Sequence, residues 1–212
     1  PSFVLTPDGR QIIFAGNVGA TTQLFVRSLD AAEAVPLAGT SGASSPFLSP
    51  RGDWVGFLAD GEIRKTPIAG GPVVKIARLI DGGLASASPH VPAEKDFFGA
   101  AWGEDDAIVF GRFAEGLWQV SASGRAPQRF TAAKDQVQRL PHYLPDRRGI
   151  LVTIGLKAEM GIAVIPPSGG EPKILIEHAS DARFVGPGNL VFARDGVLMA
   201  APFDLSKLDV TG

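Results

Sequence analysis

The three histidines are the first residues here that could do chemistry, because an imidazole can carry a proton or bind a metal ion. His90, His142 and His178 lie far apart in the chain, without the short spacing of a metal-binding motif. In the fold that the repeats below indicate, all three fall towards one face. A shared metal site or proton relay therefore stays open, beside the simpler interpretation that they are solvated loop side chains.

Other catalytic patterns are missing from the sequence. It contains no Gly-x-Ser-x-Gly, no His-Glu-x-x-His and no phosphate-binding Gly-x-x-x-x-Gly-Lys. The run Gly186-Pro187-Gly188 resembles part of a dinucleotide loop, but it fits a turn better because no βαβ unit surrounds it. With no cysteine, disulfides and Cys-based zinc or redox sites are also excluded. The sequence thus predicts no catalytic residue, no metal site and no cofactor.

The composition points to a turn-rich β protein. Of 212 residues, 26 are Gly and 17 are Pro, and both residue types penalise helix interiors. With 45% hydrophobic residues, 20% charged residues and a net charge of -2, the chain is neither disordered nor basic enough for a nucleic-acid partner. No apolar run approaches the roughly 18 residues of a membrane helix.

An internal repeat organises the chain. A turn followed by a short apolar run occurs five times: Leu5–Arg10, Leu48–Asp53, Trp102–Asp106, Leu144–Gly149 and Val185–Asn189. The turns recur about every 42 residues, except for one longer step after the second copy. Asp8-Gly9, Asp60-Gly61 and Asp195-Gly196 supply the positive-φ residues that tight hairpins need.

Each repeat predicts four short antiparallel strands, and this number and period are typical of a β-propeller blade. A β-sandwich is the alternative, but it would not repeat one turn chemistry at a fixed spacing. We therefore expect an all-β chain with five blades of a six- to eight-bladed ring. The predicted blades are residues 1–43, 44–83, 97–135, 138–180 and 181–212, with an insertion at 84–96.

The two ends of the repeat pattern are irregular. The chain starts at Pro1, within the expected first strand of the first blade. The fourth strand of the fifth blade is either absent or formed by residues 206–212. We expect a single propeller domain or a fragment of one, with the last outer strand cut off.

The candidate site follows from this blade order. The insertion and the starts of the first strands share one face, where extra residues on a rigid scaffold tend to be functional. The predicted ligand-binding residues are His90, Arg139, His142, Asp181 and Arg183. Ser44, Ser45 and Gln138 are expected beside them. The charged members either bind a polar ligand or pair with one another. Trp54, Trp102 and Trp118 follow the blade pattern and fit packing between blades better than an aromatic ligand cage.

The repeated turns resemble the Ser-Pro-Asp-Gly repeat of WD-like propellers of the TolB type. The stretches Gln23–Asp30, Trp54–Gly61 and Leu198–Asp204 look like the C-terminal propeller of bacterial serine/threonine protein kinases. The turn at residues 103–106 departs from the family pattern, as do Arg51 and Arg147. The kinase motifs themselves are absent from this chain, so the resemblance implies no kinase activity for any residue here.

The resemblance implies a non-catalytic propeller that binds a protein, a peptide or a small polar ligand. It would be the extracytoplasmic sensor or interaction domain of a membrane-anchored bacterial kinase, or a TolB-like protein. It implies a periplasmic or extracellular location, without nucleic-acid binding or membrane insertion by this segment. Two alternatives stay open, namely the substrate-gating propeller of a prolyl-oligopeptidase-like hydrolase and a lyase or lactonase with a site in the channel.

Overall fold

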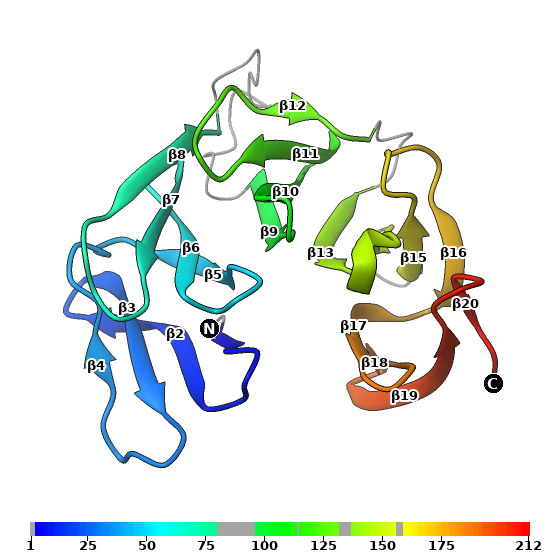
Figure 1. Cartoon of the computed structure of the whole chain (residues 1–212), viewed down its shortest axis with the longest axis horizontal. Helices are drawn as coiled ribbons and strands as arrows, with labels where there is room; N and C mark the ends of the chain where they lie inside the picture. Colours follow the sequence, from blue (N-terminus) through cyan, green and yellow to red (C-terminus); the bar gives the residue numbers. More distant parts are fainter. Residues whose placement is uncertain (1–2, 80–95, 114, 132–136, 156–158) are drawn as a thin grey trace. The chain divides into compact units, whose positions relative to one another are not determined.

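The computed structural model describes residues 3–79, 96–113, 115–131, 137–155 and 159–212. They form five four-stranded antiparallel sheets, each with its strands in simple sequence order (Figure 1). The chain divides into two compact units. Unit 1 contains residues 1–96, 102–108 and 120–127, and unit 2 contains residues 97–101, 109–119 and 128–212. The first two sheets belong to unit 1 and the last two to unit 2, while the third contributes to both.

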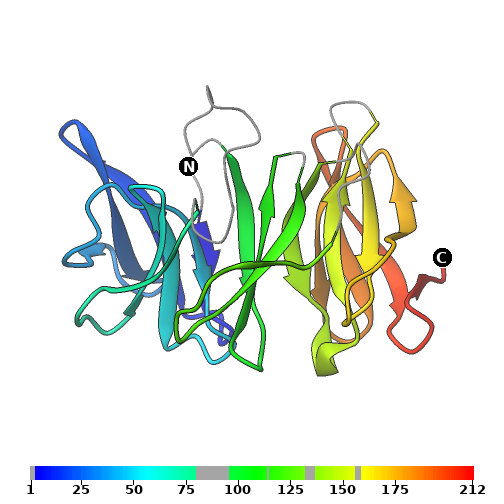
Figure 2. The ribbon, with the colours of Figure 1, turned by 90° about the horizontal axis from the view of Figure 1, so that it is seen from above.

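The strands are short, as the turn-rich sequence predicts. The first sheet contains β1 (Phe3–Leu5), β2 (Gln11–Val18), β3 (Thr21–Ser28) and β4 (Val35–Pro36). The second contains β5 (Ser44–Leu48), β6 (Trp54–Ala59), β7 (Glu62–Pro67) and β8 (Val74–Arg78). The third contains β9 (Phe97–Trp102), β10 (Ala107–Arg112), β11 (Gly116–Ser121) and β12 (Gln128–Arg129). Figure 2 shows the strands of each sheet running side by side in alternating directions.

Unit 2 holds the two remaining sheets. The fourth contains β13 (Gln138–Tyr143), β14 (Ile150–Ile154), β15 (Gly161–Ile165) and β16 (Lys173–Glu177), with the 3-10 turn η3 (Pro145–Arg147) between its first two strands. The fifth contains β17 (Ser180–Val185), β18 (Asn189–Arg194), β19 (Val197–Asp204) and β20 (Asp209–Val210). The sheets pack face to face, as propeller blades do: Leu151, Ile162 and Val164 of the fourth contact a cluster that includes Leu190 and Phe192 of the fifth.

The repeated turn between the first two strands is held by a hydroxyl and a carboxylate. Ser49 Oγ donates to Asp53 Oδ1 at 2.7 Å and accepts the N–H of Trp54 at 3.0 Å. Thr6 makes the equivalent bonds to Asp8 Oδ1 and from the N–H of Gln11. Each hydroxyl therefore satisfies one backbone donor and fixes one acidic side chain. The hydrogen bond from Ser49 is the main reason that the pKa of Asp53 is lowered.

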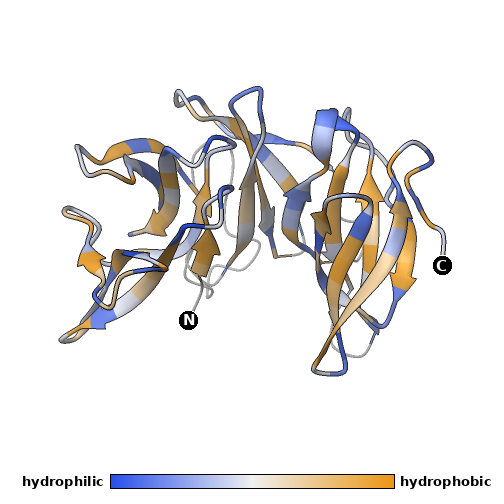
Figure 3. Ribbon diagram, turned by 60° about the horizontal axis from the view of Figure 1, so that its bottom comes forward, coloured by the Kyte–Doolittle hydropathy of each residue, from blue (hydrophilic) through white to orange (hydrophobic). Residues whose placement is uncertain are grey.

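Of the three Asp-Gly pairs expected to supply hairpin residues, two lie in hairpins between the second and third strands. Asp60-Gly61 and Asp195-Gly196 both have positive φ at both residues, as a two-residue hairpin requires. In Asp8-Gly9, only the glycine has positive φ. Asp8 instead accepts a hydrogen bond within the turn between the first two strands. Figure 3 shows many strands as largely hydrophobic, with hydrophilic stretches in several of the loops that connect them.

The first strands of the second, fourth and fifth sheets each contain one irregularity. In β5, β13 and β17 the register with the neighbouring strand shifts by one residue, which is a β-bulge. The bulges coincide with positive φ at Ser45, Leu140 and Asp181, where a residue other than glycine is strained. Gly99 in β9 also has positive φ, and a Cβ there would lie 3.5 Å from the Leu140 Cα.

A fourth strand completes the fifth sheet, contrary to the expectation that it is cut off. β20 pairs with the end of β19, Phe203 with Val210 and Asp204 with Asp209. Lys173 of β16 ties this short strand to the fourth sheet, because its Nζ lies 2.9 Å from Asp209 Oδ2 and donates to the Leu208 carbonyl. The alternative prediction, that residues 206–212 supply the strand, is therefore the correct one.

The expectation of an all-β chain with five four-stranded propeller blades is confirmed. The number of blades in a complete ring, and the assignment of the chain as one domain or a fragment, stay predictions. Among the residues that the structure describes, no helix has the length and apolar character needed to cross a membrane.

A hydrogen bond at the bulge in β17 should contribute to the stability of the fold. The N–H of Asp181 donates to Thr153 Oγ1 at 2.8 Å, and Thr153 is fully buried on β14. Thr153→Val should leave this donor without its partner and lower the free energy of unfolding by about 1–3 kcal/mol. Urea denaturation measures this loss. Thr153→Ser keeps the hydroxyl and is the control; equal losses in both variants would show that the hydrogen bond is unimportant.

Candidate ligand-binding site

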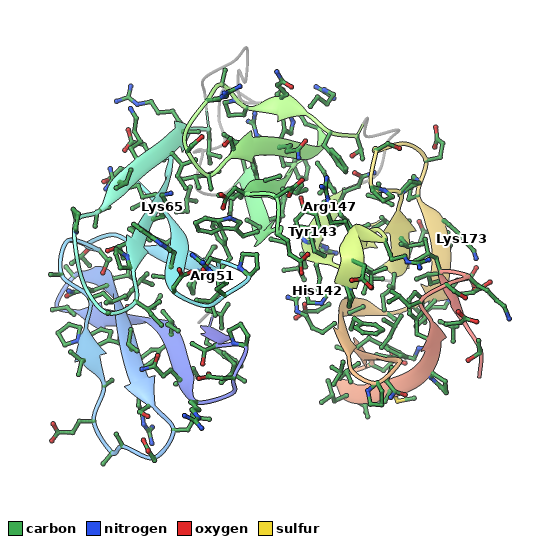
Figure 4. All side chains as sticks on the ribbon, in the orientation of Figure 1. Arg51, Lys65, His142, Tyr143, Arg147 and Lys173 are labelled. Atoms are coloured by element: carbon green, nitrogen blue, oxygen red, sulfur yellow. The ribbon has the colours of Figure 1, made fainter. Side chains whose placement is uncertain are left out.

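The bulges place His142 and Arg183 at equivalent positions. Each is the first residue paired again after the bulge of its strand, His142 with Leu151 and Arg183 with Val191. The first strands β13 and β17 lie side by side in unit 2, so residues one repeat apart become neighbours (Figure 1). Figure 4 shows His142 at the edge of the unit opposite to Lys173. The repeat in the sequence is thus what brings these two side chains together.

Asp181 completes this group. Its Oδ1 lies 2.6 Å from Nη2 of Arg183, and both side chains are nearly half exposed. The alternative in which the charged residues pair with one another therefore applies to Asp181 and Arg183. The positive φ of Asp181 and its backbone bond to Thr153 hold the carboxylate in place. We call His142, Asp181 and Arg183 the strand cluster.

His142 is neutral at physiological pH. Burial, together with the positive charge of Arg183, lowers the pKa of this imidazole to about 4. A neutral imidazole carries one donor and one acceptor nitrogen, whereas the neighbouring ion pair offers charge of both signs. The strand cluster can therefore take part in hydrogen bonding over the whole neutral pH range without a change in its charge.

The other predicted residues fall elsewhere. Arg139 lies one residue before the bulge of β13, where its guanidinium donates to the Gly155 carbonyl at 3.4 Å and contacts Met160 Sδ. Gln138 is buried and accepts from the Thr131 hydroxyl, so the expectation that it faces a ligand is wrong. Ser44 and Ser45 belong to unit 1. His90 lies outside the described residues.

A pocket of about 690 Å³ opens at one end of the fourth and fifth sheets. This hairpin end, as we call it, contains the hairpin between β18 and β19 and the connection from β16 to β17. The pocket is lined by Met160, Glu177, His178, Ala179, Ser180, Ala193, Arg194 and Asp195. Arg139 reaches it indirectly through its contact with Met160. All the lining residues belong to unit 2, and so does the strand cluster.

Sequence reasoning found one lining residue of this pocket, His178, and missed the rest. Asp195 was predicted only as a turn residue, and Glu177 was not predicted at all. The rule that the hairpin and the strand-to-strand connection share one face of a propeller was a usable signal for both. No described residues form a group of three or more His, Asp or Glu side chains able to hold a metal ion.

The tryptophans lie at the predicted strands and contact cationic side chains. Lys65 Nζ lies 4.9 Å from the ring centroid of Trp54 and 5.5 Å from that of Trp102, so one ammonium occupies the space between two indoles. The guanidinium of Arg129 lies 5.1 Å from the ring of Trp118. Cation–π contacts of this kind stabilise packing within the protein. The packing interpretation is therefore favoured over a ligand cage.

Comparison with known proteins identifies the fold without identifying a family. No family model matches the sequence, and no curated protein matches it. Among solved structures, TolB from Acinetobacter baumannii is similar at 16% identity and a TM-score of 0.66, over 96% of this chain and 54% of that one. The present chain thus spans about half the length of that TolB. A chain of a nidogen/laminin complex is similar at 11% identity and a TM-score of 0.67, over 99% and 77% of the two chains.

Two further similarities concern proteins of different roles. One is the extracellular domain of the putative hybrid two component system BT4673 from B. thetaiotaomicron, at 12% identity and a TM-score of 0.59, over 96% of this chain and 27% of that chain. The other is an oligogalacturonate lyase in complex with manganese, at 13% identity and a TM-score of 0.53, over 98% and 74% of the chains. Similarity at these identities establishes a shared fold, and one fold hosts many functions.

The low pKa of His142 predicts a pH dependence of stability. From pH 6.5 down to about 4, the unfolded chain binds a proton at this residue and the folded chain does not. Folding stability should therefore fall as the pH decreases through this window. His142→Gln should show a smaller fall than the wild type in urea denaturation at pH 7 and pH 4.5.

Proton NMR provides a direct check of the same prediction. The His142 imidazole should titrate near pH 4, and Arg183→Gln should raise that value because it removes the neighbouring positive charge. A wild-type titration near 6.5 would contradict the burial of the imidazole.

Proposed function

We propose that this chain is a non-catalytic binding propeller, the extracytoplasmic sensor or interaction domain of a membrane-anchored bacterial serine/threonine kinase or of a TolB-like protein. Its ligand is a protein, a peptide or a small polar molecule. The observation that carries the proposal is that one unit presents both the strand cluster and the pocket at its hairpin end. Rigid strands position the charged groups, which suits recognition.

The fold similarities support this role by analogy. A TolB and the extracellular domain of a two-component system share the fold. The C-terminal propeller of bacterial kinases is the resemblance carried by the sequence itself. Together they favour a domain that binds, placed on the outer side of a bacterial membrane.

The enzymatic alternatives have weaker support. The gating alternative depends on a Gly-x-Ser-x-Gly domain outside these 212 residues, just as the sensor role depends on a kinase domain outside them. The lyase alternative rests on a shared fold at a TM-score of 0.53. We therefore treat the chain as a binding module, and a reaction in the channel as the hypothesis to be tested against it.

The coding sequence that flanks residues 1 and 212 tests the assignment of the parent protein. A kinase domain and a membrane helix upstream are the expected result for the sensor role. A downstream hydrolase domain with a nucleophile elbow would replace the proposal by the gating alternative.

A metal titration distinguishes the binding module from a metal-dependent lyase. Addition of Mn²⁺ or Ca²⁺ to about 5 mM should shift the melting temperature by less than about 1 °C, because ligands stabilise only the folds that bind them. The same samples should release no unsaturated product from oligogalacturonate. Stabilisation by millimolar Mn²⁺ together with product release would overturn the non-catalytic role.

A further inference from the structure

We propose that the pocket at the hairpin end binds a compact zwitterion, a ligand with one ammonium and one carboxylate group such as a free α-amino acid. The inference rests on the proposed binding role and adds the class of ligand. It comes from charged side chains of both signs that line one pocket without pairing to each other.

Two carboxylates provide the negative side of this pocket. Glu177 ends β16 and Asp195 begins the hairpin between β18 and β19, so they come from different sheets. Both residues are exposed, and neither forms an ion pair within the part of the chain that the structure describes. In the same unit, Asp181 pairs with Arg183 and Asp209 pairs with Lys173. The two carboxylates of the pocket remain available to a ligand ammonium.

Arg194 provides the positive side. Its guanidinium carbon lies 5.6 Å from the ring centroid of Phe192, and its Nη2 donates to the main-chain carbonyl of Glu177 at 2.9 Å. These contacts hold the group in place without neutralising its charge. Its Nε is buried and has no hydrogen-bond partner among the described residues. A guanidinium that is held in place and not neutralised is suited to donate hydrogen bonds to a ligand carboxylate.

A ligand with charge of one sign would fit this pocket poorly. A simple cation would meet the guanidinium, and a simple anion would meet both carboxylates. A zwitterion presents each charge to its opposite, and the reverse orientation would bring like charges together. The arrangement therefore selects for the class of ligand and also for its orientation.

The size and the remaining lining agree with this class. A volume of about 690 Å³ lies within the roughly 300–1,000 Å³ usual for small-molecule sites. Met160, Ala179 and Ala193 offer apolar surface to a side chain, and Ser180 adds a hydroxyl. A metal site is not the better explanation, because these residues do not form a metal-binding group in the described structure.

Thermal shift with four probes tests the proposal on the wild-type chain. L-leucine carries both charges, its methyl ester only the ammonium, and N-acetyl-L-leucine only the carboxylate. At about ten times its dissociation constant, leucine should raise the melting temperature by about 3 to 6 °C. The ester and the N-acetyl compound should each give less than half of this shift. Glycyl-leucine, with its charges further apart, distinguishes a free amino acid from a short peptide.

Two variants assign the charges, with calorimetry as the readout. Arg194→Gln should weaken leucine binding about tenfold and leave binding of the ester unchanged. Asp195→Asn should weaken leucine binding while leaving N-acetyl-leucine unaffected. Arg10→Gln and Asp30→Asn remove exposed charges in unit 1 and serve as matched controls. Circular dichroism confirms that each variant is folded. If Arg194→Gln does not fold, the affinities of Asp195→Asn for leucine and N-acetyl-leucine test the proposal alone.

The outcomes that overturn the inference are specific. No shift with leucine or glycyl-leucine at 10 mM, or equal shifts with all four probes, would exclude a zwitterion site. Equal loss of binding in the control variants would attribute the effect to overall charge. The proposed binding role would still hold after such a failure if the flanking sequence encodes a kinase domain and a membrane helix. The zwitterion site and the binding role can therefore fail separately.

Discussion

The strained bulges in β13 and β17 are the constraint on which the candidate site depends. A residue other than glycine with positive φ costs about 1–2 kcal/mol relative to an extended residue, and this applies to Ser45 in β5, Leu140 in β13 and Asp181 in β17. The bulge adds one residue to the strand and so decides which side chain faces which way beyond it. His142 and Arg183 are neighbours because the same irregularity occurs in both β13 and β17. Without the bulge, a one-residue slip would turn each of these side chains to the other face.

Charge is used in two different ways in unit 2. In the strand cluster, Asp181 and Arg183 pair directly and the adjacent imidazole stays neutral, so the cluster has no net charge at physiological pH. At the hairpin end, Arg194 is held by an aromatic ring and a carbonyl, while Glu177 and Asp195 have no ion pair among the described residues. Exposed ion pairs contribute little to stability. The difference between paired charges in the strand cluster and unpaired charges at the hairpin end therefore affects ligand binding more than it affects stability.

Much of the fold was predictable from the sequence, because turn chemistry repeats where the strands do. The five sheets, the Asp-Gly hairpins and the strands that hold the tryptophans all follow from local patterns. The bulges could not be predicted, since nothing about Leu140 as a residue type indicates positive φ. The fourth strand of the last sheet is only two residues long, and it depends on the distant Lys173. The pocket was missed for a similar reason, because whether Glu177 and Asp195 find partners is decided by tertiary structure.

The hydrogen bond from Asp181 to Thr153 has a consequence for how the chain assembles. A main-chain donor of the fifth sheet is satisfied by a side chain of the fourth, and Lys173 links the same two sheets at their outer strands. The N–H of Asp181 in the fifth sheet thus has no partner until the fourth sheet, which carries Thr153, has formed. In repeat architectures, such nearest-neighbour terms set the size of the cooperative unit. The two sheets should therefore open together in native-state hydrogen exchange, with the amide of Asp181 reporting on both.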